Sequence, residues 1–439
     1  MNYAKLIFET ALEDHKKKTE KEEKNCECLF CQEVFYEDVL IKAAKQNEIY
    51  FCSIASESNF IDLLYYAPTE GKWLFEGKSL IKQVIGYLER EFASLKTHKV
   101  NDIIQTIARR RIIKRTELNP PQYLGVKNGV INLETFELAP HHPKYFITRT
   151  INARYDPDAY PTKFMTFLDE MLMFKEDKET VFEMTGYGFY NGYSIHNFFI
   201  LYGPTHAGKS LLSNVINILF GEENYASVGL HELADDKNGY ATADLYNKMI
   251  NIAPDMSGKP LKDTSIIKAL TGESFLRGRQ IYQAPIKFKN TAKLMGETND
   301  LPEIYNDVSN AFYERAIIIE FPNQFKGEDM NRNLLAELTT EEKLNGILRF
   351  ALLGLQKLLG RGYFNSFFKN TAEKEGNYLK KSNPIKYLCE YVLDEEIEGY
   401  ETIDEIYLQY TAICIDASKP PIGRRSLGKR IRKYYPDIE

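Results

Sequence analysis

The chain has 439 residues, of which 44% are hydrophobic and 27% charged, and its formal net charge is −6. This length suits about three domains, and the composition is that of a globular protein with no apolar run of about 18 residues to cross a membrane. No secretory signal is recognisable at the N-terminus, so a cytoplasmic location is expected. The net acidity excludes a general coating of nucleic acid, because affinity for phosphates depends on clustered Lys and Arg.

Residues 1–58 are predicted to be a helical, cysteine-containing appendage, with a helix from Tyr3 to about Lys18. Cys26, Cys28 and Cys31 form a Cys-x-Cys-x2-Cys run, and with Cys52 they could supply four thiolates to a zinc ion. The spacing is not that of a standard zinc site. Incidental cysteines in a helix-loop segment are the alternative that we favour.

Residues 59–158 are predicted to form an α+β module. Helical periodicity covers 80–95 and 100–113, and turn-rich strands surround 125–133. A basic cluster in this module either contacts nucleic acid locally or forms a solvated helix face. Its members are Arg109, Arg110, Arg111, Lys114 and Arg115.

A phosphate-binding motif follows a predicted buried strand at 197–202. The segment Gly203-Pro-Thr-His-Ala-Gly-Lys-Ser210 matches the P-loop pattern, and a helix is predicted over 211–220. In such loops the backbone N–H groups surround the phosphates, the lysine reaches the β- and γ-phosphates and the serine binds Mg²⁺. We therefore expect ATP and Mg²⁺ as cofactors. The predicted nucleotide-binding residues are Gly203, Pro204, Thr205, His206, Ala207, Gly208, Lys209, Ser210 and Leu211.

A site that hydrolyses nucleotides also needs an acid on a neighbouring strand. Apolar strands alternate with polar helices from about 159 to 321, which predicts a mostly parallel sheet with flanking helices. Asp255 follows the predicted strand 249–253, at the end where open α/β sheets bind ligands. Asp255 is thus the candidate that holds Mg²⁺ together with Ser210. A turn residue or helix cap is the alternative for an Asp in this place.

Five motifs in this order resemble those of the superfamily 3 helicases, within them the poxvirus, satellite-phage and plasmid type of primase-helicase. The motifs are Gly203–Ser210, Asn251–Asp255, Ile267–Gly272, Ala292–Pro302 and Glu314–Phe321. The resemblance covers roughly residues 60–439. It implies a multidomain, mainly α/β protein in which residues 159–366 form a P-loop motor of the AAA+-like type. Only about 60 residues precede the shared module, so we expect no primase domain and no primer synthesis.

The resemblance implies catalytic roles for four residues, of which Lys209 and Asp255 are already identified above. Asn299 resembles the sensor asparagine that hydrogen-bonds the attacking water and the γ-phosphate, although a plain turn residue is the alternative. Arg315 resembles the arginine finger that a neighbouring subunit inserts. Many relatives have two adjacent arginines, whereas Glu314 stands in the first place here. A finger acting in trans implies a closed homo-oligomeric ring, in this family usually a hexamer.

The resemblance also places a DNA-gripping β-hairpin at 275–289. An ordinary hairpin with solvated charges is the alternative. The residues expected to contact DNA in this region are Lys268, Arg279, Tyr282, Lys287 and Lys289.

Residues 367–439 are predicted to hold a linker and a small helix-turn-helix or winged-helix-like domain. The segment 364–381, rich in Asn and Lys, is interpreted as the linker. An amphipathic helix begins near Ile403, Pro420 and Pro421 interrupt the chain, and a basic segment follows. Its cations either contact DNA or form a solvated face. They are Arg424, Arg425, Lys429 and Arg430.

The leading hypothesis is an ATP-dependent DNA helicase or translocase, active in the host cytoplasm during replication of a virus, plasmid or mobile element. Its partners would be single-stranded or forked DNA, further copies of the chain and a separate primase or polymerase, and no membrane. The main alternative is an ATP-switched module that binds an origin or recruits a replisome without processive unwinding. A metabolic kinase is disfavoured, because it has no use for the two arginine-rich segments.

Overall fold

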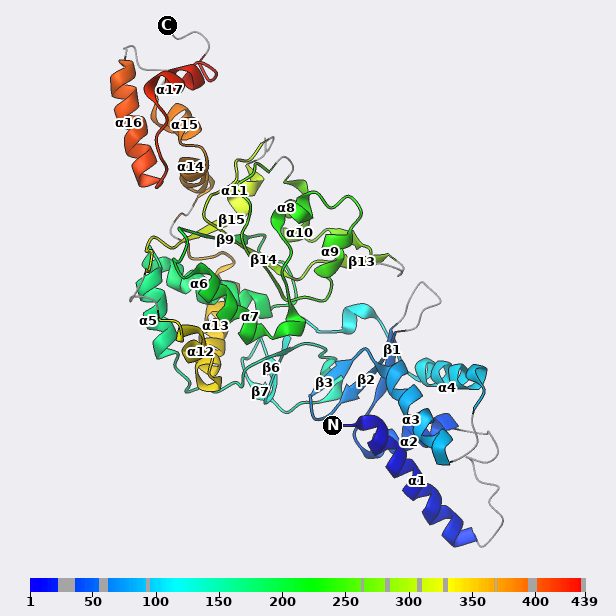
Figure 1. The fold of residues 1–439 in the computed structure, drawn as a ribbon. Helices are drawn as coiled ribbons and strands as arrows, with labels where there is room; N and C mark the ends of the chain where they lie inside the picture. Colours follow the sequence, from blue (N-terminus) through cyan, green and yellow to red (C-terminus); the bar gives the residue numbers. More distant parts are fainter. Residues whose placement is uncertain are drawn as a thin grey trace. The chain divides into compact units, whose positions relative to one another are not determined.

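The computed structural model describes residues 1–22, 36–54, 62–91, 95–261, 264–280, 285–305, 310–326, 331–366, 368, 370–393 and 401–435. The chain divides into two compact units, residues 1–155 and 156–439. Each unit combines helices with β-sheet (Figure 1), so the predicted mixed α/β character is confirmed. Among the helices in these ranges, none is long and apolar enough to cross a bilayer.

The first unit contains two four-stranded sheets. The first sheet has the order β3 (Lys72–Leu74), β2 (Asp62–Ala67), β1 (Phe51–Ile54) and β4 (Ile112–Ile113). The second has the order β7 (Leu138–Ala139), β6 (Gly129–Asn132), β5 (Tyr123–Val126) and β8 (Thr150–Ile151). The helices of this unit are α1 (Tyr3–Glu22), α2 (Tyr36–Gln46), α3 (Gly77–Glu91) and α4 (Thr97–Arg110).

Strand β2 separates two apolar clusters of the first unit. Leu63 and Tyr65 pack with side chains from helices α1 to α4, whereas Leu64 and Tyr66 pack with Trp73. This is the alternation that a strand's two-residue period produces. The predicted helix 100–113 is wrong at its end, because residues 112 and 113 pair with β1 as strand β4.

The second unit is built on a five-stranded sheet. Its order is β10 (Tyr225–Ala226), β11 (Ile250–Ala253), β14 (Lys293–Thr298), β9 (Phe198–Tyr202) and β15 (Ala316–Glu320). Every neighbouring pair is parallel, as the sequence predicts. Because the carboxyl ends of all five strands lie at one edge, the loops that follow β9, β11 and β14 meet there.

Helices cover both faces of this sheet (Figure 1). Phe198 and Ile200 of β9 belong to the cluster that α8, α10 and α11 share, whereas the ring of Phe199 lies 5.0 Å from that of Phe364. A sheet buried on both faces has strands that are continuous apolar runs, which explains the pattern at 197–202. On one side lie α5 (Thr162–Met171), α6 (Lys175–Phe189), α7 (Lys209–Phe220), α12 (Leu334–Leu338) and α13 (Glu341–Arg361). On the other lie α8 (Leu230–Ala234), α9 (Tyr240–Asp244), α10 (Ser265–Thr271) and α11 (Ala311–Arg315).

The predicted hairpin is present as a two-stranded antiparallel ribbon of β12 (Phe275–Gly278) and β13 (Ile286–Lys289). Residues 281–284 between the strands, which include the predicted contact Tyr282, lie outside the described residues.

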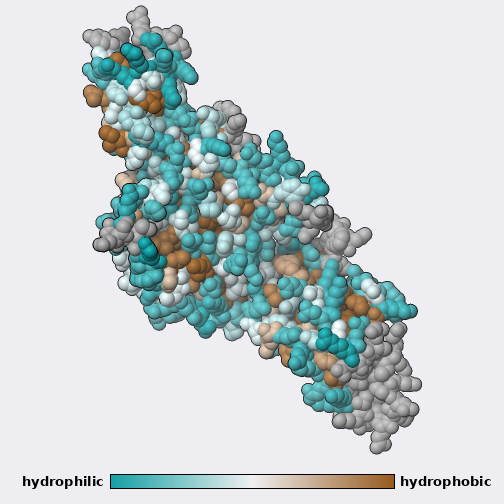
Figure 2. All heavy atoms as spheres, in the orientation of Figure 1, coloured by the Kyte–Doolittle hydropathy of each residue, from teal (hydrophilic) through white to brown (hydrophobic). Residues whose placement is uncertain are grey.

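The C-terminal segment has a small core of its own, formed by Leu388, Tyr410, Cys414, Leu427 and other buried side chains. Apolar side chains also reach the visible surface of this segment (Figure 2). Its elements are α14 (Thr371–Ser382), α15 (Pro384–Tyr387), η5 (Leu388–Val392), α16 (Ile403–Asp416) and α17 (Arg424–Ile431).

The interpretation of 364–381 as a linker is wrong for its second half, which is helix α14. The side chain of Asn370 accepts a hydrogen bond from the backbone N–H of Glu373 and caps this helix. Tyr378 and Leu379 are buried in the core of the second unit. The burial of these two side chains stabilises the helix although the segment as a whole is polar.

Candidate functional site

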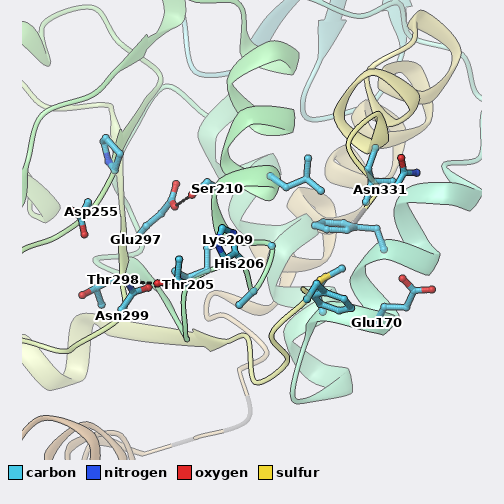
Figure 3. Close-up of a pocket in the computed structure, with 18 of the residues that line it drawn as sticks. Glu170, Thr205, His206, Lys209, Ser210, Asp255, Glu297, Thr298, Asn299 and Asn331 are labelled. Atoms are coloured by element: carbon cyan, nitrogen blue, oxygen red, sulfur yellow. Dashed lines mark hydrogen bonds between the residues drawn. The ribbon is translucent and has the colours of Figure 1, made fainter. Parts of the chain in front are cut away.

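A cavity of about 770 Å³ opens where the carboxyl ends of β9, β11 and β14 meet (Figure 3). This volume lies within the range of small-molecule sites. Its lining comprises Lys163, Thr166, Phe167, Glu170, Met171, Thr205, His206, Ala207, Gly208, Lys209, Ser210, Leu211, Pro254, Asp255, Glu297, Thr298, Asn299, Phe325, Asn331 and Leu334. Most of the residues predicted for nucleotide binding are therefore brought together around one cavity.

The loop from Gly203 to Ser210 turns sharply between β9 and α7. Gly208 has φ +94°, and a Cβ atom there would lie 2.8 Å from the sulfur of Met171. Glycine is required for both the conformation and the space. Helix α7 begins at the next residue, so its N–H groups and the positive end of its dipole are directed at the cavity.

Lys209 is buried and held by three acceptors. Its ammonium group donates to the carbonyl oxygens of Gly203 at 2.7 Å and Pro204 at 2.8 Å, and to Oδ1 of Asn299 at 2.7 Å. Burial lowers the pKa of Lys209, and the carboxylates of Glu297 and Asp255 act in the opposite direction. The predicted sensor residue Asn299, which follows β14, thus contacts the predicted phosphate-binding lysine. Asn299 also donates from Nδ2 to the hydroxyl of Thr205 at 3.2 Å.

Three carboxylates line the cavity: Glu170 on α5, and Asp255 and Glu297 at the ends of the strands β11 and β14. Asp255, the predicted Mg²⁺ ligand, follows β11, has an exposed side chain and adopts φ +51°. Glu297, near the end of β14, is 5% exposed, and its Oε2 accepts a hydrogen bond of 2.6 Å from the hydroxyl of Ser210. Ser210, Asp255 and Glu297 all supply oxygen atoms, the donors that Mg²⁺ prefers.

Glu297 is absent from the sequence prediction, although a signal existed. It stands two residues before Asn299, and alternate residues of a strand lie on the same face. An acid in the strand 293–298 that shares a face with a catalytic candidate points to the same cavity.

The end of the cavity away from Asn299 is mixed, since apolar side chains lie there beside the polar Glu170 and Asn331. Phe167 and Met171 of α5, Phe325 after β15 and Leu334 of α12 line it. The hydrogen bond of 3.1 Å from the backbone N–H of Phe325 to the carbonyl of His206 joins this wall to the loop. A polar end beside a helix N-terminus suits the phosphates of a nucleotide, and the apolar side chains at the other end offer a surface for its base.

Arg315 is not among the described residues that line this cavity. Its Nη1 donates to the carbonyl of Lys268 at 3.0 Å and to the hydroxyl of Thr271 at 2.8 Å, which joins the end of α11 to α10. The side chain is partly exposed. Lys268, predicted to contact DNA, lies on α10 and is also partly buried.

One face of the hairpin β12–β13 is exposed and cationic. Phe275 lies opposite Lys289 and Arg277 opposite Lys287, and all four side chains are exposed, whereas Leu276 and Phe288 pack inward. The ammonium of Lys287 lies 4.8 Å from the ring centre of Phe275, and that of Lys289 lies 5.5 Å from it. The prediction did not select Phe275 or Arg277, which share this face.

Arg279, just after β12, is exposed as well. The predicted cations of α17 are Arg424, Arg425, Lys429 and Arg430, all exposed. Arg424 is paired with Asp404.

The basic cluster of the first unit is partly neutralised. Arg110 pairs with Asp38, Arg115 pairs with Asp62 at 2.7 Å, and Arg111 lies over the ring of Phe146. This arrangement favours a structural role over a phosphate contact for these three residues.

Of the four cysteines in the zinc hypothesis, only Cys52 lies in the described residues. It is buried in β1, and burial raises the pKa of its thiol to about 12, which disfavours the thiolate that zinc requires. Cys26, Cys28 and Cys31 lie outside these residues, so the hypothesis remains a prediction.

Two family models match parts of the chain. Residues 62–173 match the model described as D5 N terminal like, and residues 201–315 match a family of unknown function, DUF5906. The second match includes the loop Gly203–Ser210, Asp255, Glu297 and Asn299.

The chain is also similar to two solved apo structures of the NrS-1 C-terminal region, each at 14% identity over 86% of this chain and 88% of that one. The TM-scores are 0.50 for the A form and 0.49 for the other, so the A form supports a shared fold and no more. Both family models are typical of phage and viral primase-helicase proteins, which relates this chain to replication proteins of that kind.

Proposed function

We propose that the chain is an ATP-driven DNA motor, a helicase or translocase that works as a ring in the replication of a virus, plasmid or mobile element. One observation carries this proposal. Lys209, Ser210, Asn299 and two carboxylates converge on a nucleotide-sized cavity at the N-terminus of α7. This is the set of groups that phosphoryl transfer to water needs, because its catalysis consists of positioning and charge stabilisation.

Each group has a role in this proposal. The ammonium of Lys209 leaves its carbonyl partners and binds the β- and γ-phosphates. The N–H groups at the start of α7 hold the remaining phosphate oxygens. Asn299 orients the attacking water. Asp255, predicted from the sequence as a Mg²⁺ ligand, is proposed instead to accept the proton of this water. Mg²⁺ bound with ATP would neutralise phosphate charge at Ser210.

Ring assembly is proposed from the position of Arg315. A cation is needed where charge spreads over the γ-phosphoryl oxygens, and within its own chain Arg315 is bonded to α10. A neighbouring subunit can supply it if Arg315 leaves these partners on assembly. A hexamer is the assembly that the resemblance to superfamily 3 helicases implies.

DNA binding is proposed for the exposed hairpin face. Arg277, Lys287 and Lys289 offer charge to phosphates, and Phe275 offers a flat surface to a base or sugar. Arg279 extends the cationic surface toward the turn.

The test measures ATP hydrolysis with and without single-stranded DNA, and strand separation of a forked duplex. We expect hydrolysis that DNA stimulates and unwinding that depends on ATP. The double substitution Arg279→Ala and Lys287→Ala should abolish unwinding and leave ATP binding unchanged. Loss of unwinding supports a translocase. The ATP-switched alternative would be supported if the wild type shows no processive unwinding and the variant still binds an origin or a replisome. If the wild type does not bind ATP, both functions are refuted.

A further inference from the structure

Asp255 and Glu297, the cavity carboxylates at the ends of β11 and β14, differ in how they are held. Asp255 is exposed, follows β11 and itself has a left-handed backbone conformation. Glu297 is buried in the body of β14, and Figure 3 shows its carboxylate directed at Ser210 while Asp255 lies apart. The difference matters because ATPases of this class couple the loop serine to an acid that stabilises the metal.

The backbone fixes Glu297 tightly. Its strand pairs with β9 on one side, with Glu297 opposite Leu201, and with β11 on the other. Its carbonyl accepts a hydrogen bond of 2.6 Å from the N–H of Met256, the residue after Asp255. The side chain therefore has little freedom and reaches Ser210 from a rigid element.

A buried carboxylate is costly unless hydrogen bonds satisfy it. The hydroxyl of Ser210 supplies one such bond at 2.6 Å, and the field of Glu297 acts on Lys209, whose pKa it raises against the effect of burial. Glu297 thus lies within the electrostatic range of both loop residues that would touch Mg²⁺ and phosphate.

We propose that Glu297, and not Asp255, is the acid that positions Ser210 for magnesium. This inference rests on the proposed function and assigns a residue within its site. When Glu297 accepts the hydrogen bond from the Ser210 hydroxyl, the free lone pairs of that oxygen are turned toward the cavity, where the metal would bind. Glu297 is a positioning residue, since it acts through Ser210. Asp255 is then free to act on the attacking water.

The experiment compares Glu297→Gln, Asp255→Asn and Ser210→Ala by the affinity for a fluorescent ATP analogue, measured in Mg²⁺ and again in EDTA. Binding of Mn²⁺ with ATP, followed by electron paramagnetic resonance, gives a second readout that does not depend on turnover. Glutamine keeps the size of the side chain and removes its charge, but its amide oxygen can still accept a weaker hydrogen bond from Ser210. Glu297→Leu, which has no acceptor, is therefore measured beside it. In EDTA, E297Q should bind within about twofold of the wild type. Its gain in affinity from Mg²⁺ should fall by about 10- to 100-fold, the effect expected for a residue that orients a metal ligand.

D255N should retain the Mg²⁺ effect and lose hydrolysis. The double variant S210A/E297Q should lose no more of the Mg²⁺ effect than S210A alone, because the two residues act as one unit. If E297Q fails to fold, E297D takes its place, and a partial loss of the Mg²⁺ effect is expected from the shorter carboxylate.

A normal Mg²⁺ effect in Glu297→Leu, or its loss in D255N alone, would overturn the inference and leave the proposed function intact. Failure of the wild type to bind the analogue in either buffer would instead overturn the proposed function, and this inference with it.

Discussion

The cavity at the ends of β9 and β14 and the exposed face of the hairpin β12–β13 belong to the same unit and offer charge in opposite ways. In the cavity, Lys209 and Glu297 are 7% and 5% exposed, and each is hydrogen-bonded to defined partners. On the hairpin, Phe275 is 63% exposed and the cations around it are open to water. A buried charge therefore acts on a ligand from one fixed position, whereas the exposed cations attract a ligand through their combined charge.

This difference predicts how the two regions respond to substitution. A buried charged group that contacts a reacting phosphate has no substitute, so a single substitution should remove nearly all of the activity. The exposed cations share one diffuse role, and each loss should lower DNA affinity in a graded and salt-dependent manner.

The largest effect is expected from Lys209→Ala. ATP hydrolysis should fall by about 10,000-fold or more, because the ammonium group acts both on the binding of the phosphates and on their charge at the reacting centre. The fold should persist, since the buried partners of Lys209 include two carbonyls and Asn299, which can bind water entering the cavity. Steady-state turnover and circular-dichroism melting check both points, with the exposed Lys237→Ala as the control. Retention of more than a few per cent of the activity would remove the lysine from the mechanism.

Arg315→Ala should lower hydrolysis by about 1,000-fold or more while nucleotide affinity changes little. The sharper measurement mixes Arg315→Ala chains with Lys209→Ala chains. A mixture of the two should recover part of the activity, because some interfaces then combine an intact loop with an intact arginine. If subunits exchange and no activity returns, Arg315 acts within its own chain, and the argument for an obligate ring fails.

A second buried acid, Asp177 of α6, tests whether burying a carboxyl group lowers the stability of this unit. Burial raises the pKa of Asp177 to about 7, and the nearby Glu320 and Glu176 carboxylates add to the effect, although the backbone N–H of Glu320 opposes it. Lys381 pairs with Glu320 at 3.1 Å and is the cation of this cluster. The folded state therefore holds a proton that the unfolded state releases near pH 4, so stability should fall as the pH rises from about 4 to about 7.

Asp177→Asn should remove this fall and raise the free energy of unfolding at pH 8 by up to about 4 kcal/mol. Urea unfolding at pH 5 and pH 8 measures it, with the exposed Asp235→Asn as the matched control. Equal stability gains at both pH values would show that Asp177 is ionised in the folded protein at both, and that its burial imposes no pH-dependent cost.

Much of the second unit could be predicted because its patterns are local. Helix α5 buries Phe164, Phe167, Leu168 and Met171, the residues that its period of 3.6 places on one face. The buried strands β9 and β11 are short apolar runs, and the loop Gly203–Ser210 is specified by its own residues. The strands and the loop were therefore found within one or two residues of their observed bounds.

The errors have nonlocal causes. Helix α14 was missed because its stability comes from Tyr378, which packs against Phe312 and Tyr313 far away in sequence. The pairing of Ser210 with Glu297 spans 87 positions and depends on the registration of β14 beside β9. Composition and motif spacing carry no information on such contacts, and only the two-residue period of β14 hinted at the second.

The smallest effect should come from the hairpin, and it decides whether the exposed face behaves as a diffuse surface. Replacing Lys287 and Lys289 together by Ala should weaken single-stranded DNA binding about tenfold at moderate salt. The slope of log affinity against log salt should decrease by about 1.4, since each phosphate contact contributes about 0.7 on a single strand. Phe275→Ala should also weaken binding, by about tenfold, but leave that slope unchanged, because stacking releases no counterions.

Fluorescence anisotropy over a salt series measures both quantities, and Lys175→Ala, an exposed lysine at the start of α6, serves as the control. Equal slopes for the wild type and the double variant would show that the two lysines do not contact phosphates. The cations of this face would then be solvated charges, and the hairpin would differ from the cavity in having no ligand.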